Sequence, residues 1–215
     1  MNMKTKRILM SVVGVAICGI FAGLFQYVAF GVDPFQCFVN GFSALLPHVA
    51  FGTLYLFLNI GLLLFSLLCD RHCIGIATFI NMFLLGYIVQ FTVQGLNALL
   101  PAPSLALRIV LMPVALLGLS LSASLYITAD LGVSTYDAVA LIMANKWKLM
   151  RFRYCRILTD FCCVVIGSVL FLLSGKSFSQ LFAIAGIGTI LTAFFMGPVI
   201  EWCDRHISKP LLGKE

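Results

Sequence analysis

Long apolar runs separated by short polar breaks fill almost the whole chain. The six longest runs approach or exceed the roughly 20 residues that an α-helix needs to cross the hydrocarbon core of a membrane. They lie at about 8–30, 53–69, 74–96, 108–129, 154–174 and 178–200. Two further apolar segments are shorter, about 20 Å long at 1.5 Å per residue. The pattern predicts an all-α, polytopic transmembrane helix bundle.

The two shorter segments, 34–46 and 134–145, have the signals of helices that start within the membrane. Asp33 is a good N-cap, Pro34 suits the first helical position, and Ser134 can cap the second segment. Because each segment is shorter than a hydrocarbon core of about 30 Å, we expect half-helices that enter and return on the same side. The alternative, in which both segments cross, raises the number of spans from six to eight.

The sequence around each short segment occurs twice, about a hundred residues apart, which indicates an internal repeat. Gly31-Val32-Asp33-Pro34 returns as Gly132-Val133-Ser134-Thr135. Gly75-Ile76-Ala77-Thr78 returns as Gly186-Ile187-Gly188-Thr189. The other matches pair Arg7 with Arg108, Asn59 with Asp160, Gly19 with Ser120, and Gly23 with Ser124.

Basic residues indicate how the two repeats, 1–100 and 101–215 of one integral membrane domain, are oriented. The residues after the first short segment carry no Lys or Arg, whereas residues 146–156 carry five. Loops so different are expected on opposite sides of the membrane, so we expect inverted repeats, as in many transporters. The positive-inside rule places the N-terminus in the cytoplasm. It does not separate six spans from eight, because only Arg71 and Arg108 exchange sides.

The composition excludes a water-soluble fold. Hydrophobic residues make up 61% of the chain and charged residues 10%, and the mean hydropathy is +1.07, which leaves too little polar surface for a soluble globule. The net charge of +6 follows from cations at helix ends, so no nucleic-acid partner is expected. In residues 146–153 cations alternate with apolar side chains, which predicts contact with anionic lipid head groups.

Asp160 is the sharpest chemical signal, since it lies inside a predicted span. An acid there costs roughly 2.5–3.5 kcal/mol on insertion scales and usually faces a cavity or a partner. We interpret Asp160 as an ion-coupling or proton site. The alternative is a helix-packing acid paired with Arg153 or Arg156.

Polar residues near the two breaks are candidates for a substrate site near the midplane, because broken helices expose backbone groups there. The starts of half-helices favour an anion, whereas the acids favour a cation, and the sequence leaves this open. In the alternative reading Asp33 and Ser134 are plain caps and Asp137 is a solvated loop residue. The candidates are Asp33, Gln36, Asn59, Asp130, Ser134, Tyr136 and Asp137.

No enzyme chemistry is apparent. Cys69-Asp70-Arg71-His72 recurs as Cys203-Asp204-Arg205-His206, but this spacing matches no metal motif, so neither a metal nor another cofactor is expected. The chain has no nucleophile with a base at credible spacing, no phosphate-binding glycine loop and no dinucleotide fingerprint. We therefore do not expect an enzyme.

The function these features favour is a transporter or permease for a small polar solute, with protonation of Asp160 coupled to a rocking of one repeat against the other. Two alternatives stay open: a substrate-capture subunit that needs an energising partner, and a membrane assembly or regulatory factor that transports nothing. The small-residue pairs beginning at Gly19 and Ser120 predict close helix contacts, between these two spans or their equivalents. They also leave room for a homo-oligomer.

Residues 129–138, Ala-Asp-Leu-Gly-Val-Ser-Thr-Tyr-Asp-Ala, with the matching stretches at 31–34 and 186–189, resemble the YczE/YitT-type family of bacterial membrane proteins. The resemblance covers nearly the whole chain. It implies a bacterial inner-membrane location and five to six helices. It supplies no substrate and no site residue, and Thr135 stands where the family pattern has proline.

Overall fold

The computed structural model describes residues 3–213, apart from the side chains of Cys73 and Arg153. This part of the chain contains helices and turns and no β-strand. Six helices are long and apolar enough to cross a membrane, which confirms the predicted all-α, multi-span bundle. Five of them are α1 (Met3–Val28), α3 (Phe51–Cys69), α4 (Ile76–Leu99), α5 (Leu105–Ala129) and α7 (Phe152–Leu173), and the sixth is α9 (Ile187–Cys203) together with its extension to Leu212.

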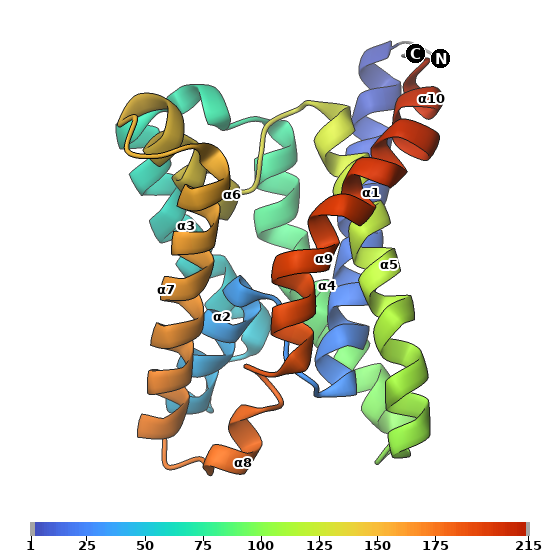
Figure 1. Cartoon of the computed structure of the whole chain (residues 1–215), viewed down its shortest axis with the longest axis vertical. Helices are drawn as coiled ribbons and strands as arrows, with labels where there is room; N and C mark the ends of the chain where they lie inside the picture. The colour runs from blue at the N-terminus through green and yellow to red at the C-terminus, as the bar shows by residue number, and fades with distance from the viewer. Residues whose placement is uncertain (1–2, 214–215) are drawn as a thin grey trace.

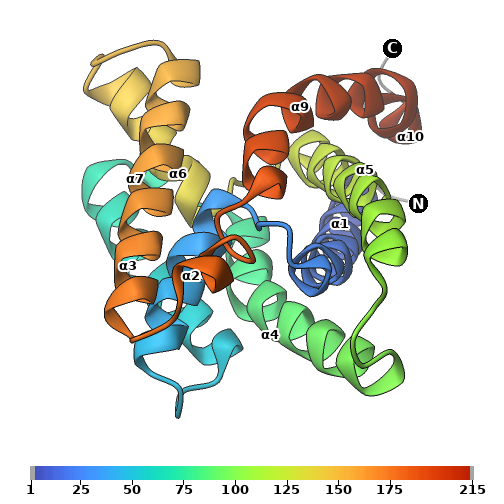
Figure 2. The same cartoon turned by 60° about the horizontal axis from the view of Figure 1, so that its bottom comes forward.

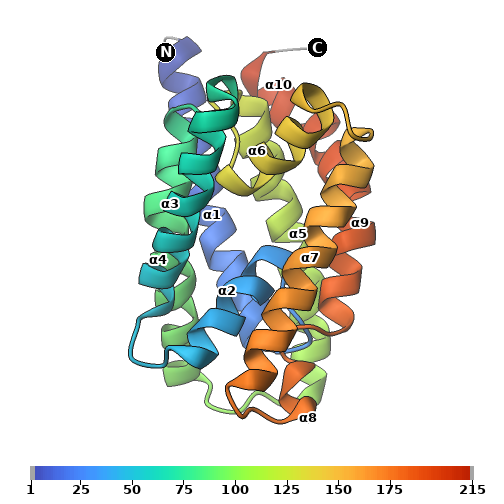
Figure 3. The same ribbon diagram turned by 90° about the vertical axis from the view of Figure 1, so that its left-hand side faces the viewer.

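The remaining elements are short. Helix α2 (Pro34–Leu45) has 12 residues and is about 18 Å long at 1.5 Å per residue, less than the membrane core. Helix α6 (Thr135–Leu141) continues into one π-helical turn, Ile142–Lys146. In Figure 3 α2 lies in one half of the bundle's height and α6 in the other. Other short elements are η1 (Arg71–Cys73), α8 (Phe178–Leu181), and a π turn (Asp204–Ser208) that extends α9 into α10 (Lys209–Leu212).

The start of α1 and the end of α10 lie at one end of the bundle (Figure 1). Figures 1 and 3 place the turn between α3 and α4, and the segment between α6 and α7, at this same end. Helix α8 and the α4–α5 turn lie at the opposite end (Figure 3). The basic segments of the chain therefore gather at one end, as the six-span arrangement requires.

The helices pack in two groups, visible side by side in Figure 2. In the first helix group α1 packs against α4 and α5, and α5 packs against α9. In the second helix group α2 packs against α7 and α3, and α6 packs against α3 and α7. Contacts between α3 and α4 join the groups. Each group combines helices from both halves of the sequence, so the two halves do not form separate bodies that could rock as units.

Small residues allow the long helices of the first group to approach closely. Gly19 and Gly23 lie against Ile88 and Thr92 of α4, whereas α1 meets α5 through Gly14. Helices α1 and α5 therefore meet as predicted, but through a different glycine. In lipid, close backbone approach of this kind supplies the van der Waals contact that holds helices together.

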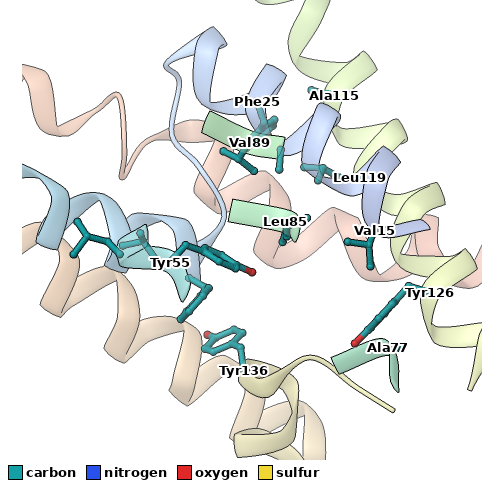
Figure 4. Close-up of a cluster of buried hydrophobic side chains, with 14 residues drawn as sticks. Val15, Phe25, Tyr55, Ala77, Leu85, Val89, Ala115, Leu119, Tyr126 and Tyr136 are labelled. Atoms are coloured by element: carbon teal, nitrogen blue, oxygen red, sulfur yellow. The ribbon is translucent and has the colours of Figure 1, made fainter. Parts of the chain in front are cut away.

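The main buried apolar cluster crosses the boundary between the groups. It includes Phe25 and Leu119 from the first group and Tyr55 and Tyr136 from the second, as Figure 4 shows. On the outside, large apolar side chains are exposed along the long helices; Phe194 of α9, for example, is 70% exposed. An apolar exterior of this kind suits lipid.

Candidate functional site

The two breaks in the chain have the same backbone conformation. Ala29 and Asp130 have φ values of 55° and 53°, and Gly31 and Gly132 have φ values of 107° and 106°. Glycine adopts such positive φ angles without strain. A Cβ at Gly132 would also lie 2.5 Å from the backbone nitrogen of Gly75, directly before α4, so only glycine fits there.

Each break docks against the glycine-led helix start of the other half of the sequence. At the first break, the Val32 N–H donates to the Ile184 carbonyl (3.2 Å), and the Phe30 carbonyl accepts from the Gly188 N–H (2.6 Å). These bonds satisfy backbone groups that lipid could not.

The second break makes equivalent contacts. The Ala77 N–H donates to the Leu131 carbonyl (3.0 Å), and Thr78 Oγ1 donates to the Val133 carbonyl (2.6 Å). The repeated glycine motifs found in the sequence are thus the surfaces that hold the breaks in place.

The two short helices begin as their caps predict. Asp33 Oδ1 accepts from the Gln36 N–H (3.1 Å) at the start of α2. Ser134 Oγ accepts from the Asp137 N–H (3.0 Å) at the start of α6. Because both starts lie at the boundary between the helix groups, the first residues of both short helices face one space.

That space is a cavity of about 600 Å³ between the two helix groups, within the range of roughly 300–1,000 Å³ typical of small-molecule sites. Its wall is mostly apolar. The polar side chains that line it are Asp33, Gln36, Tyr55, Asn59, Asn81, Ser122, Tyr126, Ser134, Tyr136, Asp137, Arg156, Asp160 and Thr192. All the sequence candidates except Asp130 are therefore brought together in this wall.

A charged network occupies the side of the cavity formed by α6 and α7. Arg156 is paired with Asp137 and with Asp160, at 3.2 Å. Tyr136 donates its hydroxyl to Asp160 at 2.5 Å, and the guanidinium lies 4.5 Å from the centre of the Tyr136 ring. Asp160 thus has the Arg156 partner of the alternative reading and also lines the cavity.

A neutral network joins α3 to α6. Thr135 Oγ1 donates to Asn59 Oδ1 (2.5 Å), and Asn59 Nδ2 donates to the Tyr55 carbonyl (2.7 Å). Phe35 stacks on Tyr136 with ring centres 5.1 Å apart and meets the Tyr55 ring edge-on. Asn59, only 1% exposed, links α3 to α6 through these hydrogen bonds.

Two polar atoms in the cavity wall lack partners among the described residues. They are Gln36 Oε1 and the Tyr126 hydroxyl, and the two residues are only 4% and 7% exposed. Buried polar atoms are nearly always hydrogen-bonded. Both residues line the cavity, so these unpaired atoms are hydrogen-bonding groups next to it that the protein does not use.

Asp130 was grouped with the cavity residues on sequence grounds, and the structure corrects this. It is the C-cap of α5, its side chain is 76% exposed, and its carboxylate lies 3.8 Å from Arg7. Arg108, which matches Arg7 in the sequence repeat, donates to the Val28 and Ala29 carbonyls at the end of α1 (2.6 and 2.8 Å). Helix ends attract cations, so this matched pair of arginines secures the ends of α1 and α5.

The two Cys-Asp-Arg-His sequences have different local roles. Asp70 caps the short turn after α3, and the backbone N–H of His72 lowers the pKa of its carboxyl. Asp204 instead accepts from Thr128 (2.6 Å) and pairs with Lys209 (2.9 Å). The described part of the chain contains no group of three or more His, Cys, Asp or Glu side chains that could hold a metal ion.

Arg156 is the main site residue that sequence reasoning missed, since it was considered only as a packing partner. The available signal was its spacing of four residues from Asp160, which places both on one helix face. Asn81 and Tyr126 also line the cavity, but no local pattern separates them from other polar residues of a span.

These features define the class: an α-helical, multi-span membrane protein with a polar-lined cavity between two helix groups. Residues 5–205 match a family described as a family of unknown function (DUF6198). The chain therefore belongs to this family. Neither the curated proteins nor the solved structures contain a match to the chain.

Proposed function

We propose that the protein is a membrane transporter for a small polar solute that binds in the cavity between the helix groups. The observation that carries the proposal is the convergence of both short helices and the Arg156 ion-pair network on one cavity. Broken helices and ionisable groups within a membrane are expensive and typically mark substrate or ion pathways. A passive structural protein would need neither.

An inverted repeat fits this function. Each half of the sequence has the same order of elements: a long helix, a glycine-led break, a short helix and two further long helices. The matching φ angles of the breaks support the same reading. Transporters use such repeats to form two related conformations around one central site.

The packing favours movement of the second helix group against the first, in place of one sequence half against the other. Only four segments connect the groups along the chain: 29–33, 70–75, 130–134 and 174–186. Segment 29–33 bonds to segment 174–186 through Val32 and Ile184, and segment 130–134 bonds to the first turn of α4, directly after segment 70–75. Short segments of this kind at element ends are where hinge motions are absorbed.

Asp160 is proposed as the protonatable group that couples this movement to pH. Protonation removes its charge and weakens its ion pair with Arg156, which frees the guanidinium to pair with Asp137 alone. In proteoliposomes, we expect Asp160→Asn to abolish the pH dependence of transport. Undiminished pH dependence in that variant would remove Asp160 from the mechanism.

We place the protein in the bacterial cytoplasmic membrane with its N-terminus in the cytoplasm, because the basic segments lie at the end that holds the N-terminus. The YczE/YitT-type resemblance supports this location. The segment 146–153 is proposed to lie on anionic lipid, with Trp147, Leu149 and Met150 exposed toward the interface.

Sided labelling of a cavity cysteine tests transport without a known substrate. Ala123 of α5 is half-buried and lines the cavity, so Ala123→Cys in a variant without native cysteines reports on water in the cavity. We expect a membrane-impermeant thiol reagent to label it from either side of the membrane. The control Ser179→Cys, in exposed α8, should be labelled from one side only.

Labelling of Ala123→Cys from one side under all conditions would contradict transport and favour a substrate-capture subunit. Labelling from neither side would contradict a hydrated cavity and favour an assembly or regulatory factor.

A further inference from the structure

The charge of the cavity wall is unbalanced. Among the described residues that line the cavity, the ionisable acids are Asp33, Asp137 and Asp160, and the only Lys or Arg is Arg156. Two of the acids are paired with Arg156. Asp33 forms no ion pair with any of the described side chains and is half-buried, so its carboxylate can act as the counter-ion of a ligand.

The groups that could attract an anion are already occupied. At the start of α2 the Gln36 N–H is bound by Asp33, which fills the end of the helix with a negative charge. The guanidinium of Arg156 is engaged by two carboxylates and the Tyr136 ring. An anionic substrate would have to displace one of these protein carboxylates.

The remaining binding capacity suits a hydrogen-bond donor. Gln36 Oε1 is an acceptor, the Tyr126 hydroxyl can accept, and both are buried without a partner in the described part of the chain. In Figure 4 the Tyr55 hydroxyl points toward the centre of the cluster, and the Tyr126 hydroxyl points toward the first turn of α4 beside Ala77. Aromatic rings also line the wall, and ring faces attract cations.

From this arrangement we infer that the cavity binds a small organic cation that carries N–H donors, an amine, with Asp33 as its counter-ion. The inference rests on the proposed function and names its substrate class. The sequence left open whether the starts of the short helices attract an anion or the nearby acids attract a cation. A cation is favoured because Asp33 itself occupies the start of α2. The amine then takes the acceptor atoms that the protein leaves unpaired.

Two thiol reagents of equal reach and opposite charge test this inference. In detergent, the protein with Ala123→Cys as its one cysteine is treated with the ethyltrimethylammonium and the ethylsulfonate methanethiosulfonates. Their rate ratio is divided by the ratio at Ser179→Cys. We expect a preference for the cation of about tenfold or more, since a wall of net negative charge attracts the cationic reagent and repels the anionic one at an effective dielectric constant of about 20.

Asp33→Asn is the decisive variant, because asparagine keeps the N-cap hydrogen bond and removes the charge. We expect it to lower the cation preference severalfold, because it removes the unpaired acid and leaves only Asp137 and Asp160 against Arg156. Asp130→Asn is the matched control, since it removes an exposed charge outside the cavity, and it should leave the preference unchanged.

The outcomes separate the two proposals. Equal rates for both reagents, or a preference that Asp33→Asn leaves unchanged, would overturn the cation inference while leaving a hydrated cavity for transport. Faster reaction of the sulfonate would assign an anionic substrate. No reaction with either reagent at Ala123→Cys would overturn the cavity itself, and transport with it.

Discussion

The two breaks share a backbone and differ in chemistry. Gly31 and Gly132 have almost the same φ, and each docks against a glycine-led helix start. The first break, however, presents Asp33 without an ion pair among the described residues, whereas the second presents Asp137 bound to Arg156. The matched backbone thus fixes where the cavity lies, while the unmatched side chains determine what it binds.

The largest effect on stability is expected from substitutions at the two glycines that shape the breaks. Gly132→Ala should reduce the free energy of unfolding by up to about 5 kcal/mol, since the left-handed conformation costs about 1–2 kcal/mol and overpacking about 1–3 kcal/mol. Gly31→Ala should behave alike, as its Cβ would lie 2.6 Å from a backbone nitrogen.

Thermal unfolding in detergent measures both variants. Gly95→Ala, in a helix with open space around the new Cβ, is the control and should be neutral. If only one of the two breaks proves sensitive, the backbones are not equivalent.

The difference in side chains predicts that ion pairs contribute to stability at the second break and not at the first. Arg156→Gln leaves Asp137 and Asp160 without their cation, and we expect a loss of about 2–3 kcal/mol, below the roughly 3–5 kcal/mol of a fully buried pair. Arg205→Gln breaks the exposed pair with Glu201 and should cost less than about 1 kcal/mol. Equal losses in the two variants would show that the Arg156 network adds nothing to stability.

A smaller effect on stability is expected from the hydrogen bond between Thr135 of α6 and Asn59 of α3. Thr135→Val removes the donor to Asn59 Oδ1 and leaves a buried acceptor unpaired, which costs about 1–2 kcal/mol. Thr53→Val, which removes a long contact of 3.4 Å with Tyr87, is the control. Urea or thermal titrations would contradict a stabilising Thr135–Asn59 hydrogen bond if Thr53→Val lowers the free energy of unfolding more than Thr135→Val does.

The smallest effect distinguishes the N-cap hydrogen bond of Asp33 from its negative charge at the first break. Asp33→Ala should lose about 1 kcal/mol with the N-cap, whereas Asp33→Asn should lose only a few tenths. Comparing the two melting temperatures shows which role matters for stability. A large loss in Asp33→Asn would mean that the charge has a partner within the protein, against the inference that a ligand supplies it.

Features fixed by local sequence were predictable. The long spans follow from apolar runs, and the starts of α2 and α6 follow from Asp33, Pro34 and Ser134, because N-caps act within one helical turn. Six of the seven substrate-site candidates and Asp160 line the cavity for a related reason. Polar residues near a break within a membrane need a hydrated surface.

Features fixed by tertiary packing were not predictable. No pattern indicated that Gly31 docks near Gly186 and Gly132 near Gly75, so the mixing of both sequence halves in each helix group was missed. Asp130 looked like a site residue because it is close in sequence to Ser134, but the α5 terminus turns it toward Arg7. Proximity along the chain was a poor guide there.

A distance measurement between the helix groups tests the central claim most directly. Spin labels on Cys162 of α7 and on Leu117→Cys of α5, both exposed positions, with the other native cysteines removed, report the separation of the groups by pulsed electron resonance. We predict two distance populations whose ratio changes with pH, while a control pair within the first group, Ile20→Cys with Leu117→Cys, gives one narrow distance. A single, pH-independent distance between the groups would contradict this claim.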